Sequence, residues 1–218
     1  MKTIHTPDGK QIEIKIDHNI LGHNDSLARQ NLELLERNGI HSIDILGSIG
    51  SGKTTTVQQL VQHLTPAKRI AAIAGDLTTT IDADRIRQKG ALVLQINTDG
   101  GCHLDANQVK TALEMLELDE IDLMLVENVG NLICPGSWPV GAHQRMVVVS
   151  VTEGPYMIVK HPHILQDASV LAINKIDLAD AMEVDIEKLK EEALNIQPGL
   201  KVVFTNARTG EGIPELIS

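Results

Sequence analysis

The sequence predicts an α/β protein with three layers, in which a mostly parallel sheet is flanked by helices. Short apolar runs alternate with segments of helical periodicity from residue 42 onward, which is the pattern of strands joined by crossover helices. A glycine-rich turn follows the first apolar run, at the end of a strand where open parallel sheets bind ligands. With 218 residues, 42% of them hydrophobic, the chain is long enough for one sizeable domain of this class and short for two.

Seven apolar runs are expected to be strands. They cover residues 42–46, 69–74, 91–96, 122–126, 145–151, 170–173 and 201–204. Helical periodicity predicts helices near residues 54–64, 81–89, 105–118, 184–194 and from 212 onward. An earlier helix is predicted after the capping residues at 24–26, with a stop at Gly39.

The domain organisation is expected to be simple. Residues 1–23 are polar and are expected to form a flexible N-terminal arm with one short strand at 11–16. Residues 24–218 contain no repeat, low-complexity tract or linker, so we expect a single domain there. Phe, Tyr and Trp occur once each, and the core is therefore expected to consist of aliphatic side chains.

The glycine-rich turn at residues 47–54 reads Gly-Ser-Ile-Gly-Ser-Gly-Lys-Thr, which matches the P-loop of nucleotide-binding proteins. Glycines allow backbone N–H groups to surround phosphate oxygens, and the N-terminus of the following helix adds positive potential. Lys53 is expected to reach the β- and γ-phosphates, and the Thr54 hydroxyl is expected to hold Mg²⁺. The sequence therefore predicts a P-loop NTPase whose phosphate-binding residues are Gly47, Gly50, Ser51, Gly52, Lys53, Thr54 and Thr55.

An Asn-Lys-Ile-Asp motif at residues 174–177 directly follows an expected strand. The Asp177 carboxylate can accept hydrogen bonds from N1–H and the 2-amino group of guanine, whereas adenine would leave this charge unpaired. Asn174 is expected to bond the other edge of the base, and the stem of Lys175 to cover its face. A last loop is expected to touch the guanine through Asn206, Ala207 and Arg208. We therefore predict GTP and GDP as ligands.

Two acidic residues follow expected strands, and both are expected to act in hydrolysis. Asp76 and Glu127, together with Thr54, are expected to hold Mg²⁺ and its waters or to orient the attacking water. Lys53 is expected to neutralise charge on the transferred phosphoryl group. The sequence thus predicts a Mg²⁺-dependent GTPase that forms GDP and phosphate.

The hydrolysis is expected to be slow. Asp82 could serve the same purpose as Asp76 or cap the following helix, and the cap is the preferred interpretation. Arg85 and Arg87 are interpreted as ordinary charges on the surface of that helix. No arginine is therefore expected to stabilise the transition state, and GTPases without such an arginine turn over slowly.

Composition limits the partners and the compartment. The net charge is −10, which argues against nucleic acid as a partner, because its phosphates require a basic face. No apolar run reaches the 18 to 20 residues or so needed to span a membrane, and the N-terminus lacks a signal-peptide pattern. We expect a cytoplasmic protein that contacts neither nucleic acid nor membrane.

The two cysteines lie in polar loops and predict a metal site. Cys102 is followed by His103, and Cys134 comes seven residues after Glu127. Thiolate and imidazole suit Zn²⁺ or Ni²⁺, although two buried, inert cysteines would also fit the sequence. Three ligands do not complete a tetrahedral site, so the fourth is expected from water or from a second copy of the chain. A loop that responds to the γ-phosphate would carry Cys134 with it.

Together these motifs resemble the HypB family, the GTPases that help to deliver nickel during maturation of [NiFe] hydrogenase. The most specific marks are the runs Cys-His-Leu-Asp-Ala at 102–106 and Glu-Asn-Val-Gly-Asn-Leu at 127–132. The resemblance implies a SIMIBI-class GTPase that forms a GTP-dependent homodimer, with Cys102, His103 and Cys134 binding Ni²⁺ or Zn²⁺ at the dimer interface. It also implies two partners, a nickel accessory protein of the HypA type and the hydrogenase large subunit. A storage module with vestigial GTPase activity and a urease-type nickel GTPase are the alternatives.

The chain departs from this family in three places. It has neither an N-terminal Cys-rich nickel motif nor a His-rich tract, so we expect nickel only at the interface site. Residues 137–142 and 155–156 differ from the usual family sequence, which makes partner docking less secure than nucleotide binding. Trp138, in the first of these segments, is either an exposed interface anchor or a local packing residue.

Overall fold

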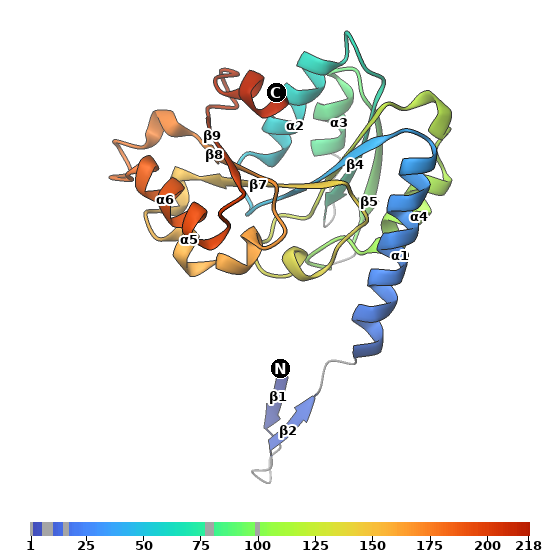
Figure 1. Ribbon diagram of the computed structural model, residues 1–218, viewed down its shortest axis with the longest axis horizontal. Coiled ribbons are helices and arrows are strands. Elements are labelled where there is room, and N and C mark those ends of the chain that lie inside the picture. The colour runs from blue at the N-terminus through green and yellow to red at the C-terminus, as the bar shows by residue number, and fades with distance from the viewer. Residues whose placement is uncertain (1, 6–10, 15–17, 77–80, 99–100) are drawn as a thin grey trace.

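The computed structural model describes residues 2–5, 11–14, 18–76, 81–98 and 101–218 (Figure 1). A seven-stranded sheet has the strand order β5-β4-β6-β3-β7-β8-β9, and every pair in it is parallel. Its strands are β3 (His41–Leu46), β4 (Ile70–Asp76), β5 (Leu92–Asn97), β6 (Leu123–Glu127), β7 (Gln144–Ser150), β8 (Val170–Asn174) and β9 (Lys201–Thr205). The predicted parallel sheet is confirmed.

Helices cover both faces of this sheet, so the molecule has the predicted three layers. One face packs against α2 (Lys53–Leu64), α3 (Ile81–Arg87) and α7 (Ile213–Ile217). The other face is covered by α1 (His18–Arg37) and α4 (Ala106–Glu114) over β4 and β6, and by α5 (Met157–Lys160) and α6 (Ile186–Ile196) over β7 and β8. Short 3₁₀ turns are η1 (Leu118–Glu120), η2 (Pro135–Ser137), η3 (Val151–Glu153), η4 (Pro162–Leu165) and η5 (Ile176–Leu178).

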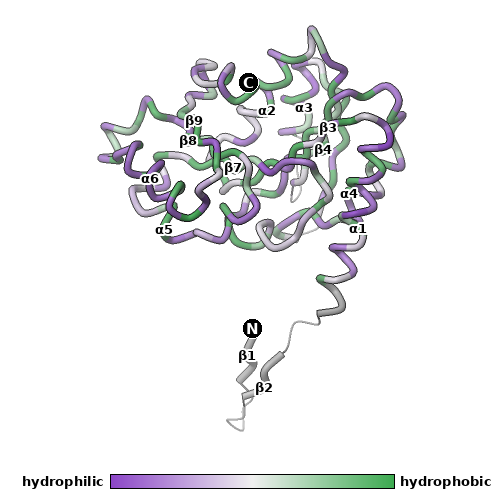
Figure 2. Tube along the Cα trace, in the orientation of Figure 1, coloured by the Kyte–Doolittle hydropathy of each residue, from purple (hydrophilic) through white to green (hydrophobic). Residues whose placement is uncertain are grey.

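The central strands are buried on both sides, which explains their continuous apolar sequences. All five residues of β6 and all five of β8 are buried, and Figure 2 shows hydrophobic residues along the middle of the sheet. Parallel strands sandwiched between helices have this composition because neither face meets water. The polar residues that end these strands are therefore exceptions, and they gather at one edge.

The N-terminal segment forms a hairpin of β1 (Lys2–His5) and β2 (Gln11–Ile14), which are antiparallel. Figure 1 shows this hairpin and the first turns of α1 beyond the edge of the large sheet. Helix α1 begins at His18, so the boundary expected at residue 23 falls inside a helix. The division of the chain into a flexible arm and one domain stays a prediction.

Most predicted elements lie within three residues of the observed bounds. Among the exceptions, α1 begins at least six residues before its expected start, and strand β1 was not predicted. Helix α4 ends at Glu114 and is followed by η1, where one helix to residue 118 was expected. The short helix α5 follows the proline at 155 and was not predicted. Gly39 ends α1 as expected, with φ of 68° and its N–H donating to the carbonyl of Glu36. No helix in the described ranges combines the length and the apolar composition needed to cross a lipid bilayer.

Candidate nucleotide and metal sites

The P-loop connects β3 to α2, at the carboxyl edge of the sheet. Gly50 and Gly52 have φ of 79° and 104°, in the left-handed region that glycine adopts without strain. A Cβ atom on Gly52 would lie 2.2 Å from Nδ2 of Asn174, and one on Gly47 would lie 2.3 Å from the carbonyl oxygen of Val148. These glycines therefore serve both the turn and its close contact with the neighbouring strands.

Helix α2 begins at Lys53 without a side-chain cap, so its first turn presents backbone N–H groups to the P-loop. Lys53 is buried, and its Nζ donates to the carbonyls of Gly47 (3.1 Å) and Ser48 (3.0 Å). Burial lowers the pKa of this ammonium group, and the carboxylates of Glu127, Asp82 and Glu153 oppose that shift. A negatively charged ligand in the loop would stabilise the charged form further.

A cleft of about 460 Å³ lies beside the P-loop. Its lining includes Lys53, Thr54 and Thr55 from α2, together with Asp76 and Glu127 from the ends of β4 and β6. In the β4–β6 register Ala74 faces Glu127, which places Asp76 two residues farther along the same edge. The structure thus brings the predicted Mg²⁺ and catalytic residues to one cleft.

Thr54 and Glu127 are joined directly within this cleft. The Thr54 hydroxyl donates to Oε1 of Glu127 at 2.6 Å, and both side chains are buried. Burial raises the pKa of Glu127 to about 7, while the bond from Thr54 and the charge of Lys53 lower it. Oε2 of Glu127 is buried and has no hydrogen-bond partner among the described residues. A hydroxyl beside a buried carboxylate is a donor set that suits Mg²⁺.

Helix α3 also contributes to the cleft, and here two interpretations of the sequence were wrong. Asp82 lies inside the first turn of α3, which begins at Ile81, and it lines the cleft instead of capping the helix. Arg85 lines the cleft as well, and its guanidinium donates to the Oγ1 of Thr55 (3.4 Å) and pairs with Asp82 (3.3 Å). Arg87 is an exposed surface charge paired with Asp84, as expected.

The residues predicted to bind guanine lie at the same edge of the sheet, after β8 and β9. Asn174 is buried and bridges three segments: its Nδ2 donates to the carbonyl of Ser51 (2.9 Å), and its Oδ1 accepts from the Ala207 N–H (3.0 Å) and the Thr205 hydroxyl (3.2 Å). The amide of Asn174 therefore already braces the P-loop against the loop after β9.

Lys175 and Asp177 are more open. Lys175 has φ of 61°, lines the cleft, and donates from Nζ to the carbonyl of Gly50 (2.7 Å). Asp177 is exposed on η5 and does not line the cleft. In the last loop, Asn206 and Ala207 are buried and Arg208 is exposed.

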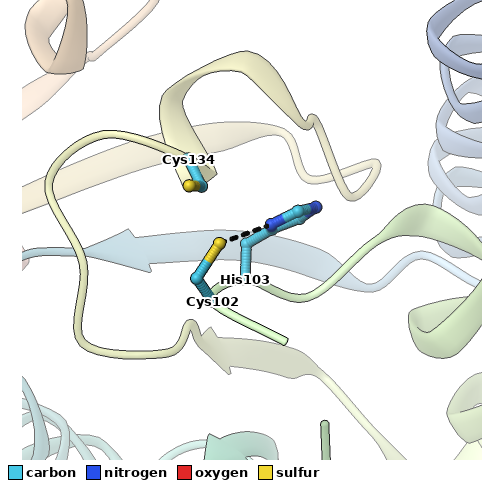
Figure 3. Close-up of side chains that lie close together, drawn as sticks. All are labelled: Cys102, His103 and Cys134. Carbon is cyan, nitrogen blue, oxygen red and sulfur yellow. Dashed lines mark hydrogen bonds between the residues drawn. The ribbon is translucent and has the colours of Figure 1, made fainter. Parts of the chain in front are cut away.

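The predicted metal ligands form a cluster on two loops that are distant in sequence. One ligand atom from each of Cys102, His103 and Cys134 can be chosen so that all lie within 4.8 Å of one another. Sγ of Cys102 lies 3.5 Å from Nδ1 of His103, and Figure 3 shows the three side chains facing a common point. Neither cysteine is in a disulfide, and both are half-buried. Two thiolates and one imidazole suit Zn²⁺ or Ni²⁺ and leave a fourth position for another ligand.

Comparison with known proteins now decides the family. Residues 42–204 match the family described as CobW/HypB/UreG, nucleotide-binding domain, and this range contains the P-loop, the cysteine cluster and the Asn174 motif. A protein of Methanocaldococcus jannaschii named probable hydrogenase maturation factor HypB is 46% identical over 204 residues, which cover 94% of this chain and 92% of that one. The chain belongs to the HypB family.

Solved HypB structures have the same fold. HypB from Archaeoglobus fulgidus superposes with a TM-score of 0.84 and 39% identity, covering 90% of this chain and 96% of that one. HypB from Helicobacter pylori, solved in complex with nickel, superposes with a TM-score of 0.84 and 30% identity, covering 89% and 91%.

Three features of this HypB chain were not evident from its sequence. Arg85 enters the nucleotide cleft beside Asp82, which their spacing of three on one helix face would allow but not require. Trp138 is half-buried, and its ring lies 4.7 Å from that of His103, so it packs beside a predicted metal ligand. Nε2 of His163 donates to the carbonyl oxygen of Leu132 (2.9 Å), two residues before Cys134.

Proposed function

We propose that this protein is a GTP-dependent metal switch. It binds GTP with Mg²⁺, hydrolyses it slowly, and couples nucleotide state and dimerisation to the binding and release of Ni²⁺ or Zn²⁺. The observation that carries this proposal is that one segment, residues 127–134, belongs to both sites. Glu127 at its start accepts the hydrogen bond from Thr54 in the P-loop, and Cys134 at its end joins the metal cluster.

Guanine specificity rests on Asp177. Lys175 and Asn174 are fastened to the P-loop, which fixes the position of η5 relative to the phosphates. The exposed carboxylate of Asp177 is then available to accept from the two donors on the edge of guanine, which adenine lacks. Because Asn174 braces the P-loop and the loop at 206–208, its main role in base binding is to hold these segments in place.

Hydrolysis rests on the residues around Glu127. Thr54, Asp76 and Glu127 would hold Mg²⁺, which when bound neutralises charge on the phosphates. Lys53 shifts from the P-loop carbonyls to the phosphate oxygens, and the carboxylates of Asp76 and Glu127 orient water. Arg85 adds a positive charge from α3, although it is held by Asp82 and Thr55. Catalysis by positioning and charge alone fits a switch that turns over slowly.

The metal is the cargo of this switch. Cys102, His103 and Cys134 supply three ligands, and a second copy of the chain would supply the rest across a two-fold axis in the GTP-bound dimer. Relatives are named hydrogenase maturation factors, and one of them was solved with nickel. We therefore assign the delivered metal to [NiFe] hydrogenase maturation, with a HypA-type accessory protein and the hydrogenase large subunit as partners.

The first test is molar mass by light scattering together with metal bound per chain, measured in GDP and in a non-hydrolysable GTP analogue. A GTP-specific dimer with altered metal stoichiometry is the expected result. A nucleotide-independent oligomer with constant metal content would overturn the switch and favour a storage module. Cys102→Ala is the matched variant, which should lose the metal and keep GTP affinity, because Cys102 lies outside the nucleotide cleft.

A further inference from the structure

A buried polar network connects the two metal-binding loops. Its members are Asp44 on β3, Arg145 on β7 and Asn128 directly after β6, and all three are buried. Polar and charged groups are costly to bury unless they are bonded, so their contacts define what the network holds in place.

Asn128 connects the first metal loop to the end of β6. Its Oδ1 accepts from the N–H of Leu104 (2.9 Å), the residue that follows His103, and its Nδ2 donates to Oδ1 of Asp44 (3.3 Å). Leu104 also packs against β4: a Cβ atom on Gly75 would lie 2.8 Å from Cγ of Leu104. Leu104, the residue beside His103, is therefore held by a hydrogen bond to Asn128 and by packing against Gly75, the residue preceding Asp76.

Arg145 extends the network to the second metal loop. Its Nε lies 3.4 Å from Oδ2 of Asp44, an ion pair buried on both sides. Its Nη1 donates to the carbonyl oxygen of Gly136 (3.1 Å), two residues after Cys134. A continuous path of polar contacts thus runs from Leu104 through Asn128, Asp44 and Arg145 to Gly136.

The nucleotide site is connected to this path of polar contacts through the peptide bond between Glu127 and Asn128. Asn128 directly follows Glu127, which accepts the 2.6 Å bond from Thr54. Any ligand that withdraws the Thr54 hydroxyl from Glu127 changes the forces on that peptide. Because Asn128 is fully buried and bonded at both ends of its amide, it cannot move without moving Leu104 or Asp44.

We propose that Asn128 is the positioning residue that transmits nucleotide state from Glu127 to the metal ligands. It acts on Cys102 and His103 through Leu104, and on Cys134 through Asp44, Arg145 and Gly136. This inference rests on the proposed function, because it presupposes that nucleotide state changes metal affinity. It adds a route whose members supply no ligand to the metal, and Asn128 itself lines the nucleotide cleft beside Glu127.

The test compares Ni²⁺ affinity in GDP with that in a non-hydrolysable GTP analogue, for the wild type, Asn128→Ala and Asn31→Ala. Asn31 is the matched control: it is equally buried and donates to the carbonyls of Ala106 (2.8 Å) and Val140 (2.9 Å), near both metal loops but without a contact to Glu127 or Asp44. Allosteric coupling typically changes affinity by about 5- to 150-fold. We expect this ratio in the wild type and in Asn31→Ala, and a ratio near one in Asn128→Ala. Each protein is saturated with nucleotide in this measurement, because Asn128 lines the cleft.

Each outcome separates the two proposals. A wild-type ratio of one would overturn the proposed switch and this route with it. A wild-type ratio that Asn128→Ala preserves, or that Asn31→Ala loses equally, would overturn the route and leave the switch standing. If Asn128→Ala does not fold, Arg145→Lys decides, because lysine keeps the charge beside Asp44 but not the guanidinium bond to Gly136. A reduced ratio in Arg145→Lys supports the route, and an unchanged ratio overturns it.

Discussion

The hydroxyl of Thr54 donates to the carboxyl of Glu127 across 2.6 Å, and this bond joins the first turn of α2 to the end of β6. Thr54 occupies the P-loop position that binds Mg²⁺, and Glu127 is the first residue of the segment that ends at Cys134. The bond therefore connects the two. Because both groups are buried, the protonation of Glu127 responds to whatever occupies the cleft. Two consequences can be measured, one in the free protein and one with ligand.

In the nucleotide-free protein, Glu127 should make stability fall as the pH rises. Burial raises the pKa of Glu127 from 4.5 to about 7, so between these values the folded state binds more protons than the unfolded state. The contribution is fully present below about pH 4.5 and is lost by about pH 7, an effect of roughly 3 kcal/mol. Denaturant unfolding at pH 5 and pH 8 checks this.

Glu127→Gln is the control for this pH dependence. Glutamine is neutral at every pH, so the difference in unfolding free energy between the two proteins should change with pH in the direction given above. Adding Mg²⁺ and GDP should reduce the pH dependence of the wild type, because a bound cation favours the carboxylate. Equal pH profiles for the two proteins without ligand would show that Glu127 ionises normally.

Asp177→Asn should reverse the base preference. An amide in place of the carboxylate keeps only one acceptor and places an N–H donor against a guanine donor, so GTP affinity should fall by about 100-fold. The same amide can donate to the 2-carbonyl of xanthine, so binding of xanthosine triphosphate should improve. Asp177 is exposed, and the fold should be unaffected. Binding of fluorescent nucleotides measures both changes.

Asp180→Asn is the matched control, because Asp180 is an exposed acid three residues farther along the same turn. It should leave both affinities unchanged. Equal GTP affinity in Asp177→Asn and the wild type would show that Asp177 does not recognise guanine.

The sheet was predictable because its strands are buried on both faces. Strand β6 has four apolar residues in a row, Leu123, Met124, Leu125 and Val126. This run lacks the helical periodicity of apolar and polar residues that would indicate a surface helix, so it predicts a buried strand. The P-loop and the residues that end β4 and β6 followed from that prediction, since parallel strands end at one edge. The sequence also indicated that Cys102, His103 and Cys134 would form one cluster.

The contacts between these parts were not predictable. Asn128 bonds to Leu104 and Asp44, which lie 24 and 84 residues away. The sequence places Asn128 in the family run at 127–132 but does not indicate these partners. Arg85 and Arg87 are two residues apart, about 200° around a helix, so only one of them can face the cleft. Which one does so depends on how α3 packs against α2, and side-chain periodicity in a seven-residue helix does not fix that rotation.

Arg85→Ala should therefore slow GTP hydrolysis, by about tenfold. The guanidinium of Arg85 lies in the cleft against Thr55 and Asp82, where it adds positive charge near the phosphates. An arginine that contacts the transferred group directly is worth about 10³-fold or more, and Arg85 is expected to give less because Asp82 partly neutralises it. Single-turnover release of phosphate measures the rate. Arg87→Ala, on the opposite side of α3, should hydrolyse GTP at the wild-type rate, and equal losses in both variants would mean a general effect on α3.

Trp138 should report metal binding directly. It is the only tryptophan in the chain, and its ring lies 4.7 Å from that of His103. Ni²⁺ held by His103 would therefore lie close enough to quench the indole fluorescence, whereas closed-shell Zn²⁺ should change it much less. A Ni²⁺ titration should give saturable quenching that Zn²⁺ competes away, and Cys134→Ser should weaken this binding by at least about tenfold. Saturable quenching that persists unchanged in Cys134→Ser would place the bound Ni²⁺ outside the cluster, because removal of one of three ligands cannot leave its affinity intact.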